Sequence, residues 1–301
     1  MPDTATNYAN YLKSKGHTSS TVKSYGQKLW AFLEWCEQHD IVAEATTHQQ
    51  LIAFIEYLKT QHHPIMQKSV KIYLLAMSHY FDWVSTTQQT NYNPVLSLKY
   101  RVPHEQKLHS ILERQQLDAL YHHYPIPEQD TTKTLNARRD KVITGLVVFQ
   151  GLTTIDLTHL TTDHLLLREG KLHIPPAKKS DGRTLDLKAA QIMDIMEYVN
   201  HVRPQLLTIR KKPSDKLLIS TGSSDQLHNT LAEALKQLKI LDPAVTSFKQ
   251  LRASVITGWI RQHNLREAQY RAGHRYISST EAYQKNDIAD LQQDIDRLHP
   301  L

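Results

Sequence analysis

The sequence predicts a mainly α-helical protein with a small antiparallel β-sheet, divided into two domains. Apolar residues recur at helical spacing through the first 94 residues. Residues 95–107 follow Asn93-Pro94, contain Pro103 and show no amphipathic period, so we interpret them as a linker. From residue 108 onward, helical patterns surround three short runs of β-forming residues. A chain of 301 residues is long enough for two domains that each bury a core.

The first domain, residues 1–94, is predicted to consist of four helices. The first covers residues 5–15 and stops at Gly16. Thr18 offers a capping side chain for a long second helix, and Thr46-Thr47 precedes a third. The fourth follows His62-His63-Pro64 and carries apolar residues from Val70 onward. No strand pattern interrupts this domain.

The second domain, residues 108–301, is predicted to mix helices with the sheet. Ser110, with Glu113 three residues later, is typical of a helix start. Arg138-Arg139-Asp140 precedes an apolar run and is expected to open a helix over 142–152. Short runs at 165–167, 172–174 and 184–187 predict the strands of the antiparallel sheet. Further helices are predicted at 189–202, 226–239, 248–262 and 265–272.

Composition excludes several classes of protein. The single cysteine, Cys36, cannot form an internal disulfide or a cysteine-built zinc site, which suits a reducing cytoplasm. No apolar run approaches the ~18 residues of a membrane span, and the first residues do not have the pattern of a signal peptide. The net charge is +6, and residues 101–301 hold 28 Lys and Arg against 23 Asp and Glu. This excess is compatible with binding nucleic acid.

Three groups near the C-terminus stand at a suggestive spacing. Lys249 and Arg252 open a predicted helix, His274 follows Gly273 after the next helix, and Tyr283 lies nine residues beyond His274. Taken singly, an arginine on a helix is usually a solvated charge, a histidine after glycine is usually a turn residue, and a tyrosine usually packs. Their significance therefore depends on the set.

The set resembles the signature of the tyrosine recombinases, the phage-integrase and Xer-like family. That signature is His-x-x-Arg, then Leu-Gly-His, then a nucleophilic Tyr after a Ser/Thr-rich turn. Residues 150–157 take the place of the family's Thr-Gly-Leu-Arg-x-x-Glu-Leu segment, and residues 178–183 match the hairpin that bears a catalytic Lys. The C-terminal matches here are Lys249-Gln250-Leu251-Arg252, Ala272-Gly273-His274 and Ser278-Ser279-Thr280 before Tyr283.

The resemblance implies a SAM-like core-binding domain of four helices followed by a mixed α+β catalytic domain. It also implies site-specific DNA recombination or integration through a 3′-phosphotyrosine, with no metal or other cofactor. Tyr283 would attack the phosphodiester, Arg252 would hold the phosphate with a cationic fork, and His274 would donate a hydrogen bond. The proton for the leaving 5′-oxygen would come from Lys178 or Lys179, since the hairpin allows either alignment.

Two positions depart from the family pattern. The first family arginine falls on Thr153, whose hydroxyl carries no charge. Losing a charge-assisted bond in a transition state costs about 10²–10³ in rate. Lys249 stands where recombinases usually have histidine, although type IB topoisomerases use lysine there.

Two interpretations follow from the missing arginine. In the first, the enzyme is active and Arg138, Arg139 or Arg275 takes over the role. In the second, the chain is a catalytically impaired DNA-binding protein on the same scaffold. Retention of the nucleophile together with its two main partners favours activity.

The resemblance also implies partners, first of all double-stranded DNA clamped between the two domains. Residues 288–301 carry apolar side chains at helical spacing and would pack on their own domain or on a neighbouring protomer of a tetrameric synapse. Accessory DNA-bending proteins are a further class of partner, whereas a membrane or an additional arm-binding domain is not expected. Candidate phosphate contacts are Ser19, Ser20, Lys23, Lys68, Lys71, Arg183 and Arg275.

Overall fold

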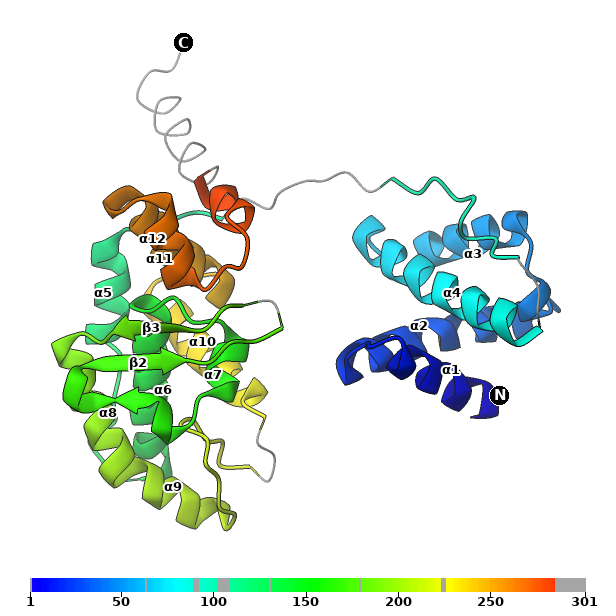
Figure 1. The fold of residues 1–301 in the computed structure, drawn as a ribbon. Coiled ribbons are helices and arrows are strands. Elements are labelled where there is room, and N and C mark those ends of the chain that lie inside the picture. The colour runs from blue at the N-terminus through cyan, green and yellow to red at the C-terminus, as the bar shows by residue number, and fades with distance from the viewer. Residues whose placement is uncertain are drawn as a thin grey trace. The chain divides into compact units, whose positions relative to one another are not determined.

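The computed structural model describes residues 2–62, 64–88, 92–101, 109–129, 131–178, 180–222 and 226–284. The chain divides into two compact units, Met1–Gln106 and Lys107–Leu301 (Figure 1). Within the described ranges, no helix combines the length and the apolar character needed to cross a membrane.

The N-terminal unit contains the four predicted helices. Thr18 caps the second, because its Oγ1 accepts a hydrogen bond from the Thr21 backbone. Thr47 caps the third through a reciprocal pair of bonds with Gln50. The helices are α1 (Pro2–Ser14), α2 (Ser19–Gln38), α3 (His48–Thr60) and α4 (Gln67–Gln88), with a 3₁₀ turn η1 (Ala43–Ala45) before α3.

Aromatic side chains fill the core of this unit. Phe32 of α2 and Phe54 of α3 are fully buried and meet edge to face with ring centroids 5.2 Å apart. Tyr8 Oη donates a 2.7 Å hydrogen bond to the Ala76 carbonyl and so fastens α1 to α4. Each fully buried ring contributes roughly 1.5–3 kcal/mol by apolar burial, which explains how four amphipathic helices form a stable unit.

The C-terminal unit surrounds a three-stranded antiparallel sheet with helices, as the sequence predicts. The strand order is β1-β2-β3, with Leu172 opposite Leu185 and Ile174 opposite Arg183. The elements are α5 (Arg114–His122), α6 (Thr132–Val148), α7 (Thr154–His159), η2 (Thr162–His164), β1 (Leu165–Leu166), η3 (Leu167–Glu169), β2 (Lys171–Ile174), β3 (Arg183–Asp186), α8 (Ala189–Glu197), a π-helical turn η4 (Tyr198–Val202), α9 (Arg203–Arg210), α10 (His228–Leu241), α11 (Phe248–Gln262) and α12 (Leu265–Ala272).

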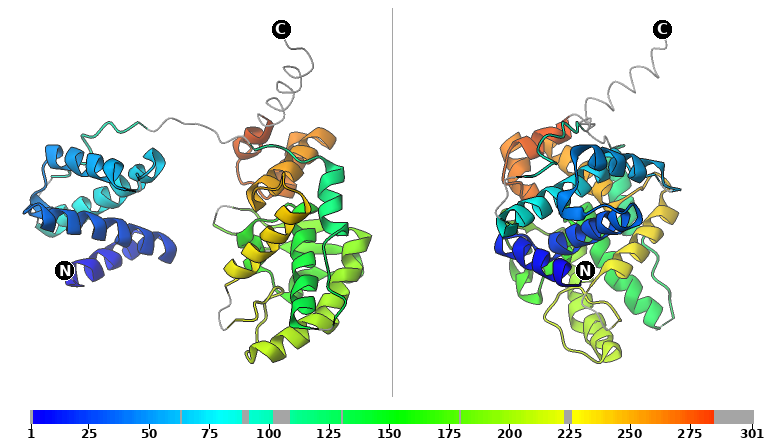
Figure 2. Two further views of the ribbon diagram at one scale, coloured as in Figure 1. Left: turned by 180° about the vertical axis from the view of Figure 1, so that it is seen from behind. Right: turned by 90° about the vertical axis from the view of Figure 1, so that its right-hand side faces the viewer.

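Helix α6 is the centre of this unit. Ile143, Leu146 and Val147 are fully buried, and α5, α8, α9, α10 and α11 all contact the helix. Gly145 allows the close approach of α5, since a Cβ there would lie 2.8 Å from Tyr121 Cε2. The sheet faces the viewer in Figure 1. Helix α10 lies on the other side of the unit, which faces the viewer in the left view of Figure 2.

Several predicted boundaries were wrong. Helix α5 begins at Arg114, because Ser110 instead accepts a hydrogen bond from Gln250 of α11. Helix α6 begins at Thr132, well before Arg138. The predicted helix 189–202 changes to the π-helical turn at Tyr198 and continues as α9 to Arg210.

The interpretation of Arg139 and Asp140 as a helix start was wrong for a physical reason. Arg139 Nε donates to Asp140 Oδ1 at 2.9 Å, and Arg139 Nη1 donates to the Ile219 carbonyl at 3.1 Å. These two residues therefore neutralise each other's charge in the interior of the helix. The sequence pattern, in contrast, places charged residues at the start of a helix.

Candidate active site

Four segments that are distant in sequence meet at one end of the C-terminal unit. They are the turn between α6 and α7 (residues 151–156), the hairpin between β2 and β3 (residues 175–182), Arg252 of α11, and residues 273–283. Hydrogen bonds connect each segment to the next, and they bring together most of the predicted catalytic residues.

Arg252 is buried and bound on several sides. Its Nη1 donates to the Gly151 carbonyl, and its Nη2 donates to the Ala272 carbonyl at 2.7 Å. Burial lowers the pKa of Arg252, and the charge of Arg183 lowers it further, whereas Tyr283 acts in the opposite direction through its charge and its hydrogen bond. An arginine starts from so high a pKa that it remains cationic near neutrality. The bonds to two carbonyls hold its fork in a fixed orientation.

His274 contacts Arg252 directly. Arg252 Nη2 lies 3.2 Å from His274 Nε2, and since a guanidinium only donates, Nε2 accepts. The ring proton is then on Nδ1, which donates to Thr280 Oγ1 at 2.9 Å. Burial, with the charges of Arg252 and Arg183, lowers the pKa of His274 to about 4. The imidazole is therefore neutral at pH 7.

Thr280 is a residue to which the sequence assigned no role of its own. It is fully buried, and its hydroxyl holds the His274 ring in place. We expect Thr280→Val to lower the rate of DNA cleavage about tenfold, the effect of losing one neutral hydrogen bond. A cleavage assay at pH 7 measures this, and Thr280→Ser, which keeps the hydroxyl, serves as the control. Equal rates for the valine and serine variants would contradict a role for this bond.

Tyr283 lies over His274. It is half-buried in the helical residues 278–284, and its ring stacks on the imidazole with centroids 5.7 Å apart and planes 13° from parallel. Its hydroxyl acts on the pKa of Arg252, which places the candidate nucleophile beside the candidate phosphate-binding cation.

The β2–β3 hairpin is attached to the His274 turn. Asp181 donates from its backbone to the Gly273 carbonyl at 3.1 Å, and Ser180 forms a β-bridge with His274. Arg275 Nη1 donates to the Lys178 carbonyl at 3.3 Å. The exposed Lys178 is therefore carried on a loop that is fastened to the cluster, whereas Lys179 lies outside the described residues.

Thr153 performs a structural task at the position of the missing arginine. It is the N-cap of α7, where its Oγ1 accepts from the Asp156 backbone at 3.0 Å and its backbone N–H donates to Asp156 Oδ2 at 2.9 Å. A Thr followed three residues later by an acid is the sequence signal for such a cap. Thr153 therefore binds its own helix and supplies no charge.

Arg183, which the sequence offered as a candidate phosphate contact, is buried. The side chain from β3 is buried, and its Nη2 donates to Asp156 Oδ2 at 3.1 Å. Burial raises the pKa of the Asp156 carboxyl, but the charge of Arg183 and the hydrogen bonds from Thr153 and Arg183 outweigh it, so this pKa lies below its ordinary value. The pair consequently stays ionised inside the unit.

The three cations considered as substitutes for the missing arginine lie elsewhere or face outward. Arg138 pairs with Glu197 of α8, and Arg139 pairs with Asp140 within α6. Arg275 is exposed and bonds to the hairpin through Asp181. Arg275 is the one of the three that contacts a segment of the cluster within the described part of the chain.

Comparison with known protein families decides the assignment. The phage integrase family model matches residues 110–289. The phage integrase N-terminal SAM-like domain matches residues 5–88. The chain belongs to the phage integrase family.

Relatives of this integrase-family chain are similar over almost its whole length. Tyrosine recombinase XerD from Haemophilus influenzae is 24% identical over 303 residues, which cover 96% of this chain and 95% of the relative. XerH recombinase bound to a palindromic difH substrate in a post-cleavage complex has a TM-score of 0.71 at 17% identity, covering 95% of this chain and 82% of that one. A lambda integrase tetramer bound to a Holliday junction has a TM-score of 0.62 at 14% identity, covering 93% and 76%.

The other candidate DNA contacts of the integrase-family chain are exposed. Ser19, Ser20 and Lys23 lie in the first turns of α2, and Lys68 and Lys71 lie near the start of α4. Lys249 is exposed in the first turn of α11, three residues before the buried Arg252. The predicted tail 288–301 and His63 lie outside the described residues.

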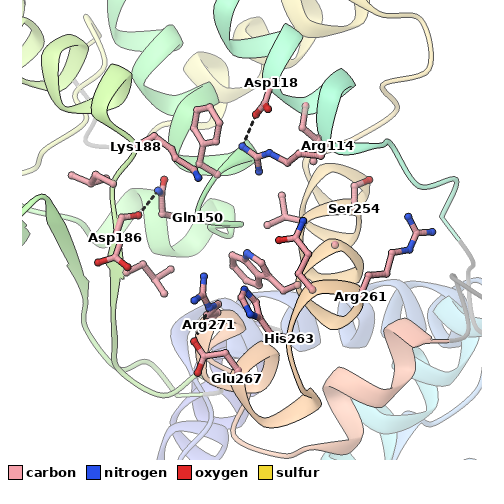
Figure 3. A pocket seen from close by; sticks show the side chains of 18 of the residues that line it. Arg114, Asp118, Gln150, Asp186, Lys188, Ser254, Arg261, His263, Glu267 and Arg271 are labelled. Atoms are coloured by element: carbon pink, nitrogen blue, oxygen red, sulfur yellow. Dashed lines mark hydrogen bonds and ion pairs between the residues drawn. The ribbon is translucent and has the colours of Figure 1, made fainter.

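A cavity of about 950 Å³ lies in a different part of the same unit, lined by α5, β3, α11 and α12 (Figure 3). Its charged side chains are largely paired, as with Arg114 and Asp118 or Arg271 and Glu267. The described residues that line it include neither Arg252 nor His274 nor Tyr283. The cavity is therefore separate from the catalytic cluster.

Proposed function

We propose that this protein is a site-specific recombinase that cuts and rejoins double-stranded DNA through a 3′-phosphotyrosine at Tyr283. One observation carries the proposal. Arg252 of α11 contacts His274, although the two residues lie 22 positions apart, and Tyr283 stacks on the His274 ring and bonds to Arg252. Their convergence gives a nucleophile, a fixed cation and a hydrogen-bonding imidazole at one place.

The reaction needs each of these groups. The Tyr283 oxygen forms a bond to phosphorus while the bond from phosphorus to the 5′-oxygen breaks. Water takes the hydroxyl proton of Tyr283 as its oxygen attacks. Arg252 then binds the charge that develops on the non-bridging oxygens. Lys178 or Lys179 of the hairpin protonates the departing 5′-oxygen, and attack by another 5′-hydroxyl on the phosphotyrosine reverses these steps.

The imidazole can join the reaction through a change of tautomer. For His274 to donate to the phosphate from Nε2, its Nδ1 has to accept a hydrogen bond from a neighbouring donor. Thr280 supplies this partner, because a hydroxyl either accepts or donates and its Oγ1 lies 2.9 Å from Nδ1. Arg252 keeps its bonds to the two carbonyls and releases Nε2 when the Nη2 proton that faces His274 binds the phosphate instead.

We infer that the working assembly contains four protomers on two duplexes. The lambda integrase tetramer on a Holliday junction is a structural neighbour of this chain and supports that arrangement. Two duplexes are required because each released 5′-hydroxyl has to find a phosphotyrosine in the other duplex.

The test captures the covalent intermediate. The full chain is incubated with a pool of nicked duplexes whose central segment is randomised, so that cleavage releases a short fragment and the adduct cannot religate. Adducts are isolated on denaturing gels and sequenced, which also identifies the preferred site. We expect the wild-type protein to form an adduct that maps to Tyr283. Tyr283→Phe should form none while still binding the selected DNA.

A second candidate function rests on Thr153. Because this position holds no charge, a protein that binds DNA without cutting it is the competing interpretation. Wild-type protein that retains duplexes from the same randomised pool in a gel-shift assay but yields no adduct with them would establish that alternative and overturn the proposal.

A further inference from the structure

We propose that Arg183 supplies, from strand β3, the second fixed positive charge of the active site, in place of the arginine absent from position 153. This inference rests on the proposed function, because it concerns the same phosphate site. Arg183 acts through its field and through the segments it holds, so it is a positioning residue.

The first observation is the shared carboxylate. Asp156 Oδ2 accepts both the Thr153 backbone N–H at 2.9 Å and Arg183 Nη2 at 3.1 Å. The guanidinium of Arg183 therefore lies beside the turn whose residue 153 would otherwise carry the charge. An arginine from strand β3 therefore lies close to residue 153, at the start of α7.

The second observation is the close fit of Arg183 under the His274 turn. A Cβ at position 273 would overlap Arg183 Nη1 and lie 2.8 Å from Ser180 Oγ. Arg183 Nη1 also donates to Ser180 Oγ at 3.3 Å, within the hairpin that carries Lys178. Arg183 thus contacts the turns that hold His274 and Lys178.

The third observation is that the guanidinium is buried and incompletely bonded. Its side chain is 0% exposed, and within the described part of the chain its Nε has no hydrogen-bond partner. A charge in such surroundings is weakly screened, so it acts over a longer distance than a surface charge. The charge of Arg183 lowers the pKa of both Arg252 and His274, and the Asp156 carboxylate acts in the opposite direction on the pKa of Arg252.

The chain offers a matched control for this pair. Arg139 and Asp140 form a second buried Arg–Asp pair, with side chains 4% and 6% exposed, and within the described residues Arg139 also donates to the Ile219 carbonyl, outside the four segments of the cluster. The test compares adduct formation in Arg183→Gln, in the double variant Arg183→Gln/Asp156→Asn, and in Arg139→Gln/Asp140→Asn. The double variants remove both charges together, which buried pairs tolerate better than the loss of one partner.

We expect both Arg183 variants to form the adduct about 10²–10³-fold more slowly while binding DNA with unchanged affinity, because Arg183 is buried. The Arg139→Gln/Asp140→Asn variant should keep the wild-type rate. Thr153→Arg should restore part of the rate to Arg183→Gln, since the introduced charge would meet the released Asp156. A folded Arg183→Gln/Asp156→Asn variant with a rate within about threefold of wild type would overturn the inference. So would failure of Thr153→Arg to restore any rate, since a purely structural role cannot be replaced from position 153.

A titration of His274 separates this inference from the proposed function. The charged and titratable groups facing His274 are Arg252 of α11, Arg183 of β3 and Tyr283 of residues 278–284, and Asp181 and Arg275 bind each other beside it. NMR of the DNA-free protein should show the pKa of His274 rising from about 4 in Arg183→Gln/Asp156→Asn, even if the wild type forms no adduct. An unchanged His274 titration would overturn the inference independently of cleavage.

Discussion

Replacing Arg252 by lysine is expected to slow formation of the covalent adduct by about 10³-fold, the upper range for losing a main electrostatic group. The guanidinium spans two carbonyls, those of Gly151 and Ala272, and also contacts His274. A lysine ammonium is a point charge without a planar fork, so it cannot hold these groups and a phosphate together. Burial also disfavours a charged ammonium at this position.

The measurement is a single-turnover adduct assay with saturating DNA. Urea unfolding in parallel should show a loss of about 1–3 kcal/mol, because a buried carbonyl loses its donor. Arg266→Lys, an exposed substitution in α12, is the control and should change neither quantity. An Arg252→Lys rate within tenfold of wild type would show that the fork geometry does not matter.

Gly273→Ala is expected to reduce adduct formation at least about 10²-fold, on the scale of a lost electrostatic contact, and to destabilise the C-terminal unit. Gly273 has φ +68°, where a side chain costs roughly 1–2 kcal/mol. The new Cβ would in addition displace the Arg183 guanidinium, which Asp156 and Ser180 hold in place. Because His274 is the next residue and Ala272 binds Arg252, the displacement would disturb both groups.

Gly16→Ala provides the matched control for this prediction. Gly16 has φ +79°, but no atom lies within 4 Å of where its Cβ would stand. The Gly16→Ala variant should therefore lose stability through backbone conformation alone and keep the wild-type rate.

A double-mutant cycle of Gly273→Ala with Arg183→Ala should show coupling, since the smaller side chain at position 183 makes room for the methyl group at position 273. Additive losses in that cycle would contradict the proposed overlap.

Sequence alone was sufficient for the fold class, and it named Arg252, His274 and Tyr283, which the structure brings together. The capping residues Thr18 and Thr47 start α2 and α3 as predicted, and α11 and α12 have the predicted bounds. These features are local, because helix starts and apolar periods depend on residues within one or two turns. The order and spacing of the motif residues Arg252, His274 and Tyr283 are likewise visible in the sequence, because they depend only on position along the chain.

Boundaries failed where long-range contacts override local signals. Arg139 and Asp140 suggested a helix start, but they form a buried pair in the middle of α6. Ser110 suggested a cap, but Gln250, 140 residues away, uses its hydroxyl. In both cases the deciding partner is distant in sequence, since Arg139 also donates to the Ile219 carbonyl and Ser110 binds Gln250.

The same distinction applies to the active site. The sequence by itself determined that position 153 lacks its arginine and that Tyr283, His274 and Arg252 are present. Only the tertiary structure decided that Arg183 lies beside Asp156 and under Gly273. A pattern of residue types cannot place a β3 side chain next to the start of α7, because that contact depends on how the sheet packs against the helices. The physical reason is that charge acts through space, whereas sequence motifs record only position along the chain.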